Sequence, residues 1–426
     1  MSNNSKFFFN TLPFILTLCL PFFLVTGPFL SDLSISICCI IFLINSYKNK
    51  LIKYYKIFFV KFFIVFNLIL ICSSVISDYP LFSIKSSLFY FRFGLFALSV
   101  WYLIDTNKNF IKFFFISILI TFVILTLDGY FQYIFNKNLI GLIPHKDFHS
   151  VRISSFFGSE LILGSYMSRL FPLFFGLFVF YFYNKKKNLY FFLFYFLFLL
   201  IYFLVFLTGE RTAFFIINFL IIYILFFINC FKKITIFFFS FLLLIFAFIL
   251  YLKPDVGNRV IKYTFSQFKK QKEVILFSSM HTGHYKTGIK MFLDNKIFGI
   301  GPNNFRKMCN EKKYITKAYA DSGDIQLSAC ATHPHNIYVQ LLAETGILGF
   351  GLILSLYLHF MYLLIKNFLN KYFLKTIDFK MSILGGFIIT LFPLIPSGNF
   401  FNNYINIIYY LPLGFYLWLA NSKAKI

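Results

Sequence analysis

Charged residues are scarce in this 426-residue chain. Asp, Glu, Lys and Arg make up 13% of it, against about 25% in a soluble domain. Acidic residues are especially few, 15 against 40 basic ones, which gives a net charge of +25, while 59% of the residues are hydrophobic and 23% aromatic. This composition excludes a cytosolic enzyme and an intrinsically disordered chain. It disfavours a nucleic-acid partner, because the basic residues lie between apolar runs rather than in one patch. A polytopic membrane protein is predicted.

Apolar runs long enough to cross a bilayer recur along the whole chain. About 20 mostly apolar residues are needed for each crossing, and about twelve stretches meet this criterion. The predicted spans are 12–30, 31–46, 55–76, 86–104, 110–128, 160–183, 189–207, 212–230, 234–252, 343–365, 381–397 and 404–420. The first is not a cleavable signal peptide, because no small-residue cleavage site follows it.

The lysines predict the orientation of these spans. Clusters at 48–56, 108–112, 185–187, 232–233 and 366–380 all fall in alternate short loops, together with both ends of the chain. Because lysine and arginine in short loops stay in the cytoplasm, both termini are predicted to be cytoplasmic.

Two segments on the outer side are too long to be simple turns. One covers about 128–159, and the larger one, 253–335, separates the ninth span from the tenth. Long ordered loops are usually functional. We therefore predict an all-α polytopic membrane protein with about 12 transmembrane helices. A bundle at 1–252 holds spans 1–9, a large outer loop covers 253–335, and 336–426 holds spans 10–12.

Two of the seven cysteines and four of the seven histidines lie in the outer loop. Cys309 and Cys330 could form a disulfide there, which sequence spacing alone leaves open. The pairs His281/His284 and His333/His335 suggest zinc, but their spacing is poor and no carboxylate or cysteine completes a ligand set. We predict no metal and no other cofactor.

Arginine is rare and its positions are unusual. The six arginines avoid the predicted cytoplasmic loops, although 34 lysines are present. Arginine binds phosphate bidentately, which lysine cannot do. Arg211, beside Glu210 in a minimal outer turn, is the strongest candidate, although the two could simply pair with each other. Arg152 and Arg259 could be anion ligands or interfacial anchors, and Arg92 and Arg169 are expected to be structural. The set is Arg92, Arg152, Arg169, Arg211, Arg259 and Arg306.

One motif carries a family resemblance. His335-Asn336 is followed, after nine residues, by a Gly-x-x-Gly element at 346–349, and a Gly-x-Gly-Pro-x-Asn-Phe element occupies 299–305. Together with the Gly-Glu-Arg-Thr turn at 209–212, this pattern resembles bacterial O-antigen ligases and the wider family that includes O-antigen polymerases. The resemblance extends over roughly residues 150–365.

The resemblance implies glycosyl transfer at the periplasmic face of the bacterial inner membrane, which would make the large outer loop periplasmic. The donor would be a glycan on undecaprenyl pyrophosphate, and the acceptor a hydroxyl of lipid A–core. His335 would be the catalytic base and Arg211 a catalytic, pyrophosphate-binding residue, with Arg152 and Arg259 as further pyrophosphate ligands. One displacement at the anomeric carbon implies inversion of its configuration. The resemblance also implies that the reaction needs no metal.

Supporting residues and alternatives stay open at this point. Glu210 supports the arginine turn; Asn336 either orients His335 or caps the following helix, and His333 could be only an anchor. Gly346 and Gly349 are expected to allow close helix approach. A polymerase would use the same donor with a second lipid-linked glycan as acceptor. A transporter of lipid-linked or anionic solutes is disfavoured, because no internal repeat is visible.

Overall fold

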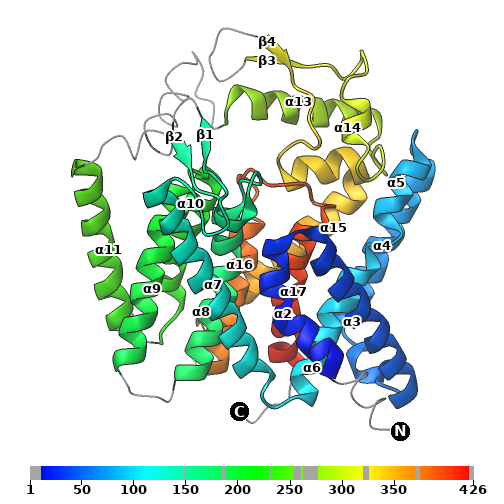
Figure 1. The fold of residues 1–426 in the computed structure, drawn as a ribbon. Helices are drawn as coiled ribbons and strands as arrows, with labels where there is room; N and C mark the ends of the chain where they lie inside the picture. Colours follow the sequence, from blue (N-terminus) through cyan, green and yellow to red (C-terminus); the bar gives the residue numbers. More distant parts are fainter. Residues whose placement is uncertain are drawn as a thin grey trace.

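The computed structural model describes residues 11–147, 150–183, 188–230, 232–252, 261, 277–319, 326–369 and 375–421. Helices dominate this part of the chain (Figure 1). The α-helices are α2 (Leu12–Thr26), α3 (Pro28–Asn49), α4 (Phe58–Ile76), α5 (Pro80–Ser87), α6 (Phe91–Thr106), α7 (Phe110–Phe135), α8 (Leu163–Phe182), α9 (Asn188–Leu207), α10 (Arg211–Phe227), α11 (Lys232–Leu252), α13 (Ser279–Asp294), α14 (Phe305–Met308), α15 (Ile337–Leu369), α16 (Lys375–Thr390) and α17 (Asn403–Asn421). The short 3-10 turns η2 (Ile52–Tyr54) and η3 (Ser155–Phe157) complete the helical elements.

Every predicted span coincides with a helix, although the boundaries differ. Within the described residues, seven helices are long and apolar enough to cross a membrane by length and composition. This establishes a multi-pass, all-α membrane architecture, while the count of about twelve spans stays a prediction. The first two spans are separated by Gly27, whose φ of 126° is accessible to glycine and ends α2 just before Pro28 begins α3.

Two of the predicted boundaries near the C-terminus are wrong. The helix predicted at 343–365 begins earlier, at Ile337, and is kinked at Gly346. The span predicted at 381–397 ends at Thr390, because Pro393 and Pro396 follow and cannot continue a helix. The residues between α16 and α17, here called the 391–402 segment, are therefore irregular.

Helix α8 forms the middle of the bundle. Nearly all of its residues from Leu163 to Val179 are buried; it packs against α16, while α17 packs against α6. Outer helices instead expose apolar side chains, such as Ile64, Leu68 and Val75 of α4. A buried centre and an apolar outer surface are expected of a bundle in lipid.

A small subdomain covers one end of the bundle. It contains α13, α14 and the antiparallel hairpin of β3 (Lys317–Tyr319) and β4 (Gln326–Ser328) (Figure 1). A second hairpin, β1 (His145–Asp147) with β2 (Ser150–Arg152), lies at the same end. The start of α2 and the end of α17 lie at the opposite end (Figure 1). Both long predicted outer segments thus lie at one end of the bundle, away from the first and last described helices.

Candidate active site

The histidine of the His-Asn motif stands at the entrance to α15. Asn336 is the residue before the helix, and its side-chain oxygen accepts the backbone N–H groups of Tyr338 and Val339 at 2.9 and 3.1 Å. Its amide donates to the Pro393 carbonyl at 2.7 Å. Of the two roles left open for Asn336, the structure shows the helix cap, which also ties α15 to the 391–402 segment.

His335 has an unusual backbone. Its φ is 58°, a left-handed conformation that costs a non-glycine residue roughly 1–2 kcal/mol. The Ser397 N–H donates to its carbonyl at 2.9 Å and holds this conformation. No hydrogen bond from the described part of the chain engages the His335 imidazole. The ring nitrogens are therefore available to a substrate.

Three further imidazoles surround this ring. The ring centroids of His333, His284 and His281 lie 4.2, 5.3 and 5.5 Å from that of His335. His281 and His284 are three residues apart on α13, so one face of that helix presents both. Within the described ranges, no group of three or more His, Cys, Asp or Glu side chains is arranged to hold a metal ion; metal-free chemistry stays a prediction.

Two of these histidines hold backbone in place. His333 Nε2 lies 3.2 Å from the Ser397 carbonyl, and its Nδ1 lies 2.9 Å from the Thr332 hydroxyl. His284 Nδ1 lies 3.1 Å from the Ala329 carbonyl. A carbonyl can only accept, so the facing nitrogen carries the proton in both rings. Both contacts orient the loop that leads to His335.

Burial keeps the imidazoles of His335, His333 and His284 neutral. Desolvation, followed by repulsion among the neighbouring imidazoles, lowers the pKa of His335 from 6.5 to about 3. The pKa of His333 falls to about 4, chiefly for the same reason, and that of His284 is also lowered. At neutral pH His335 is an uncharged imidazole, which can accept a proton.

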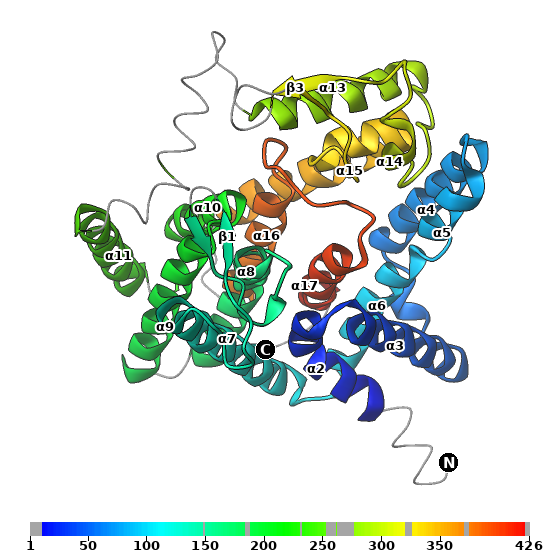
Figure 2. The ribbon, with the colours of Figure 1, turned by 45° about the horizontal axis from the view of Figure 1, so that its top comes forward.

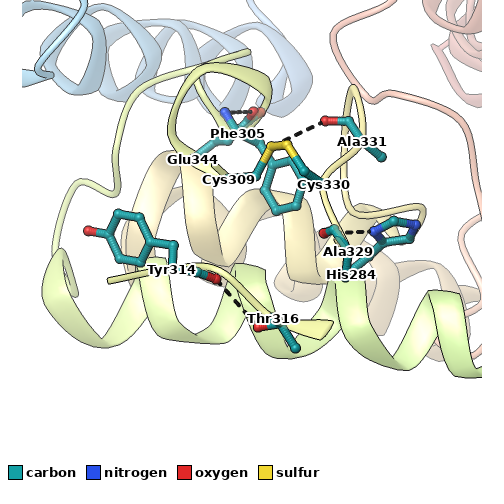
Figure 3. Close-up of a disulfide and its surroundings, with 9 residues drawn as sticks. All are labelled: His284, Phe305, Cys309, Tyr314, Thr316, Ala329, Cys330, Ala331 and Glu344. Atoms are coloured by element: carbon teal, nitrogen blue, oxygen red, sulfur yellow. Dashed lines mark hydrogen bonds between the residues drawn. A yellow bond between two sulfur atoms is a disulfide. The ribbon is translucent and has the colours of Figure 1, made fainter. Parts of the chain in front are cut away.

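A disulfide anchors the histidine loop to the subdomain. Cys309 and Cys330 are bonded, with their Cα atoms 5.1 Å apart, so the possibility left open by the sequence is confirmed. Figure 3 shows this bond beside the contact between His284 and Ala329. The segment that carries His333 and His335 thus starts from a covalent anchor.

The two glycine elements of the family pattern meet through their backbones. Gly346 has φ 65°, and a Cβ added there would lie 2.3 Å from the Ile297 carbonyl oxygen. Gly299 has φ 68°, and its added Cβ would lie 2.5 Å from the Glu344 carbonyl carbon. The sequence predicted that these glycines let another helix approach closely, but the segment that packs against Gly346 is the loop at Ile297 and Phe298. A Cβ on Gly349 would meet only the Thr345 side chain.

Polar groups that the sequence analysis did not single out connect these pieces. The Gln340 amide donates to Glu344 Oε2 at 2.9 Å and to Asn399 Oδ1 at 2.7 Å. Glu344 Oε1 accepts the Phe305 N–H at 3.0 Å. The available signal was the presence of Gln and Glu within an apolar helix, where polar groups need partners.

The arginine turn lies between α9 and α10. Arg211 begins α10, and Arg152, the last residue of β2, donates from Nε to the Thr208 carbonyl at 3.1 Å. The structure therefore brings Arg152 to the turn that carries Arg211, although 59 positions separate them in sequence. Arg259 lies outside the described residues.

Glu210 performs a role the sequence did not suggest. Its carboxylate accepts the N–H groups of Gly164 and Ser165 at 2.7 and 3.0 Å, which caps the start of α8. Burial raises its pKa from 4.5 to about 7, opposed by these two N–H groups and by the positive charges of Arg152 and Arg169. Arg169, which the sequence analysis treated as structural, therefore belongs to the same charged cluster.

The 391–402 segment adjoins both groups of residues. On one side, Ser397 contacts His333 and His335. On the other side, Phe392 packs edge-to-face against Phe219 of α10, with ring centroids 5.6 Å apart. Figure 2 shows the segment passing from α16 toward α13 and α15 and then back to α17. Its prolines and Gly398 were the signal that could have identified it as a loop.

These features define a class: a multi-pass membrane protein with a histidine cluster and an arginine cluster at one end of its bundle. Residues 194–354 match the model of the O-antigen ligase family, which confirms the family resemblance predicted from the motifs. The matched stretch contains the arginine turn, both glycine elements and His335-Asn336. The match supports a glycosyltransferase of the O-antigen ligase or polymerase type. No curated protein matches the chain significantly.

Proposed function

We propose that this protein is an O-antigen ligase-type glycosyltransferase of the bacterial inner membrane. It moves a glycan from undecaprenyl pyrophosphate to a sugar hydroxyl of lipid A–core at the periplasmic face. The observation that carries the proposal is the open imidazole of His335, held by Ser397 at the end of the bundle where Arg152 meets the Arg211 turn. The family match over these residues supports the same reaction class.

The reaction is a single displacement. The acceptor oxygen attacks the anomeric carbon of the donor sugar as His335 takes the hydroxyl proton, and the bond from that carbon to the pyrophosphate oxygen breaks. The configuration inverts, and undecaprenyl pyrophosphate leaves with the bonding electron pair. Arg211, Arg152 and Arg259 bind the leaving diphosphate, because their planar donors match phosphate oxygens and offset the developing charge.

The charge of the donor explains how a buried histidine becomes a useful base. In the unliganded protein the low pKa of His335 makes it a weak base. A diphosphate carries two or three negative charges, and an anion near an imidazole favours the protonated form. Donor binding therefore raises the pKa of His335 toward neutrality, where general-base catalysis is most effective. His335 gains its basicity only when the donor is in place.

His335→Ala in cells that depend on this protein for ligation tests the proposal. We expect the rate to fall by about 10²–10⁴-fold, the usual contribution of a general base. Lipid A–core should lack polymer, while full-length polymer accumulates on undecaprenyl pyrophosphate. Electrophoresis of lipopolysaccharide and mass spectrometry of the lipid-linked pool measure both. His359→Ala is the matched control, because His359 lies within α15, far along the helix from His335, which precedes it.

The same measurement separates the alternatives. Lipid A–core that carries single repeat units in the His335 variant would identify a polymerase that uses a second lipid-linked glycan as acceptor. An unchanged lipopolysaccharide and lipid-linked pool would contradict the proposed role of His335.

A further inference from the structure

One arginine within the bundle has donor capacity that the fold does not use. Arg169 lies on α8, six residues or about 9 Å from the start of that helix. Its side chain is 7% exposed, and its Nη1 has no hydrogen-bond partner in the part of the chain that the structure describes. A buried charge without a partner costs several kcal/mol. Such a group is retained where a ligand completes it.

Two tyrosines add further unused donors. The hydroxyls of Tyr404 and Tyr409 on α17 likewise have no partner among the described residues, and both side chains interact electrostatically with Arg169. Arg169, Tyr409 and Thr390 line a cavity of about 10 Å³. This is about the space of one water molecule, so a larger anion can reach these groups only if neighbouring side chains move. The cluster has three donor groups and no committed acceptor.

The nearest carboxylate does not meet this need. Glu210 interacts electrostatically with Arg169, but its oxygens accept the N–H groups of Gly164 and Ser165. Arg169 lies four residues further along α8 than Ser165, so its Cα is deeper in the bundle than the N–H groups that Glu210 caps. It thus lies just below the arginine turn, on the inner side of the charged cluster.

A second arginine in the membrane shows that the fold can neutralise such a charge. Arg92 of α6 pairs with Asp32 of α3, with Nη2 and Oδ1 2.7 Å apart. Arg169 has no comparable ion pair in the described ranges, although its burial is greater. Arg92 Nε also has no hydrogen-bond partner among the described residues, so the two arginines differ in the ion pair and not in the presence of an unused donor.

We infer that Arg169, together with Tyr404 and Tyr409, binds the lipid-proximal phosphate of the polyprenyl diphosphate donor. This inference rests on the proposed function. The phosphate bonded to the prenyl chain is the one closer to the membrane interior, and Arg169 is deeper than Arg152 and the Arg211 turn. The outer arginines then hold the phosphate bonded to the sugar.

The assignment of one phosphate to Arg169 and the other to the outer arginines is tested by binding two prenyl phosphates to the purified full-length protein. Native mass spectrometry titrates the chain with undecaprenyl diphosphate and, separately, with undecaprenyl monophosphate, which has only the lipid-proximal phosphate. Arg169→Gln should weaken both ligands by about tenfold or more, the usual effect of losing charge-assisted hydrogen bonds. Arg152→Gln should weaken the diphosphate and leave the monophosphate unchanged. Arg92→Gln should lower the melting temperature and leave both affinities unchanged.

A double Tyr404→Phe, Tyr409→Phe variant excludes a merely structural explanation. It removes two hydroxyls that have no partner in the described structure, so the unliganded protein should melt at the same or a higher temperature. The affinity for both ligands should nevertheless fall severalfold. If Arg169→Gln and the tyrosine variant are folded and bind both ligands like wild type, the inference is wrong and the proposed function stands. If wild type binds neither ligand, the proposed function fails as well.

Discussion

Replacing Gly346 by alanine should separate the two glycine elements and destabilise the site. At φ 65° an alanine pays roughly 1–2 kcal/mol for the left-handed conformation. Its Cβ would also lie 2.3 Å from Ile297 O, 2.4 Å from Ile297 C and 2.7 Å from Phe298 N. All three atoms belong to the backbone, so no rotamer change relieves the contact. The 297–301 loop must therefore move away from α15.

That movement breaks identifiable hydrogen bonds. Ile300 N donates to Ala343 O at 2.9 Å and Gly301 N donates to Glu344 O at 2.9 Å, while Ile347 N donates to Lys296 O at 2.8 Å. Each contributes about 0.5–1.5 kcal/mol. Together with the backbone strain, Gly346→Ala should cost about 3–5 kcal/mol of stability.

Thermal unfolding in detergent, followed by size-exclusion chromatography, measures the effect. Gly351→Ala is the matched control, because it is on the same helix and an added Cβ meets nothing within 4 Å; it should be neutral or stabilise by up to about 1 kcal/mol. Gly349→Ala should be intermediate: its added Cβ would lie 2.5 Å from Thr345 Cβ, which side-chain rotation cannot move, so the helix must shift locally, but no backbone of another segment is in the way. A Gly346→Ala protein as stable as the Gly351→Ala protein would refute the close backbone contact.

Three further predictions concern the residues around His335. The pKa of His335 is 6.5 when unfolded and about 3 when folded, so its neutral form contributes stability above pH 6.5 that is lost as the pH falls toward 3. The melting temperature should therefore fall less steeply between pH 7 and pH 4 for His335→Gln than for wild type. Equal pH dependence of the two melting temperatures would contradict the burial of the ring. Asn336→Ala should lower stability by about 1–2 kcal/mol through loss of the cap, and Asn336→Asp, which keeps the acceptor, should recover most of it in the same melts. Cys330→Ser should cost about 3 kcal/mol, as expected for a loop of 21 residues, and dithiothreitol should lower the melting temperature of wild type but not of this variant; an effect of the reductant on both would exclude the disulfide as its target.

Local pattern was sufficient for the class of fold and for the principal candidate residues. Apolar runs predicted a helix at each span, because in lipid the backbone must satisfy its own hydrogen bonds. The His-Asn and glycine elements predicted the family, and the arginine turn was identified by its residue type. Span ends near proline were predicted less well: the run from 381 to 397 is apolar throughout, yet Pro393 and Pro396 end the helix at Thr390.

Partners distant in sequence could not be predicted. The sequence offered the two histidine pairs only as a poor zinc set; that His281 and His284 lie beside His335 depends on how α13 packs on α15. Glu210 was predicted only to support the arginine turn or to pair with Arg211, and nothing in the sequence indicated that its carboxylate caps α8, which begins 47 residues earlier. Arg169 looked structural until its surroundings showed unpaired donors.

The sequence by itself indicated the environment and the family: a helical bundle suited to lipid, in the O-antigen ligase or polymerase family. Hydropathy and residue type are local properties, so they can be read along the chain. Only the tertiary structure showed that Arg92 pairs with Asp32, that Arg169 Nη1 has no hydrogen-bond partner in the described ranges, and that His335 lies among other imidazoles. Those outcomes depend on desolvation and on partners supplied by other helices, because burial and pairing are properties of the packed bundle rather than of any one segment.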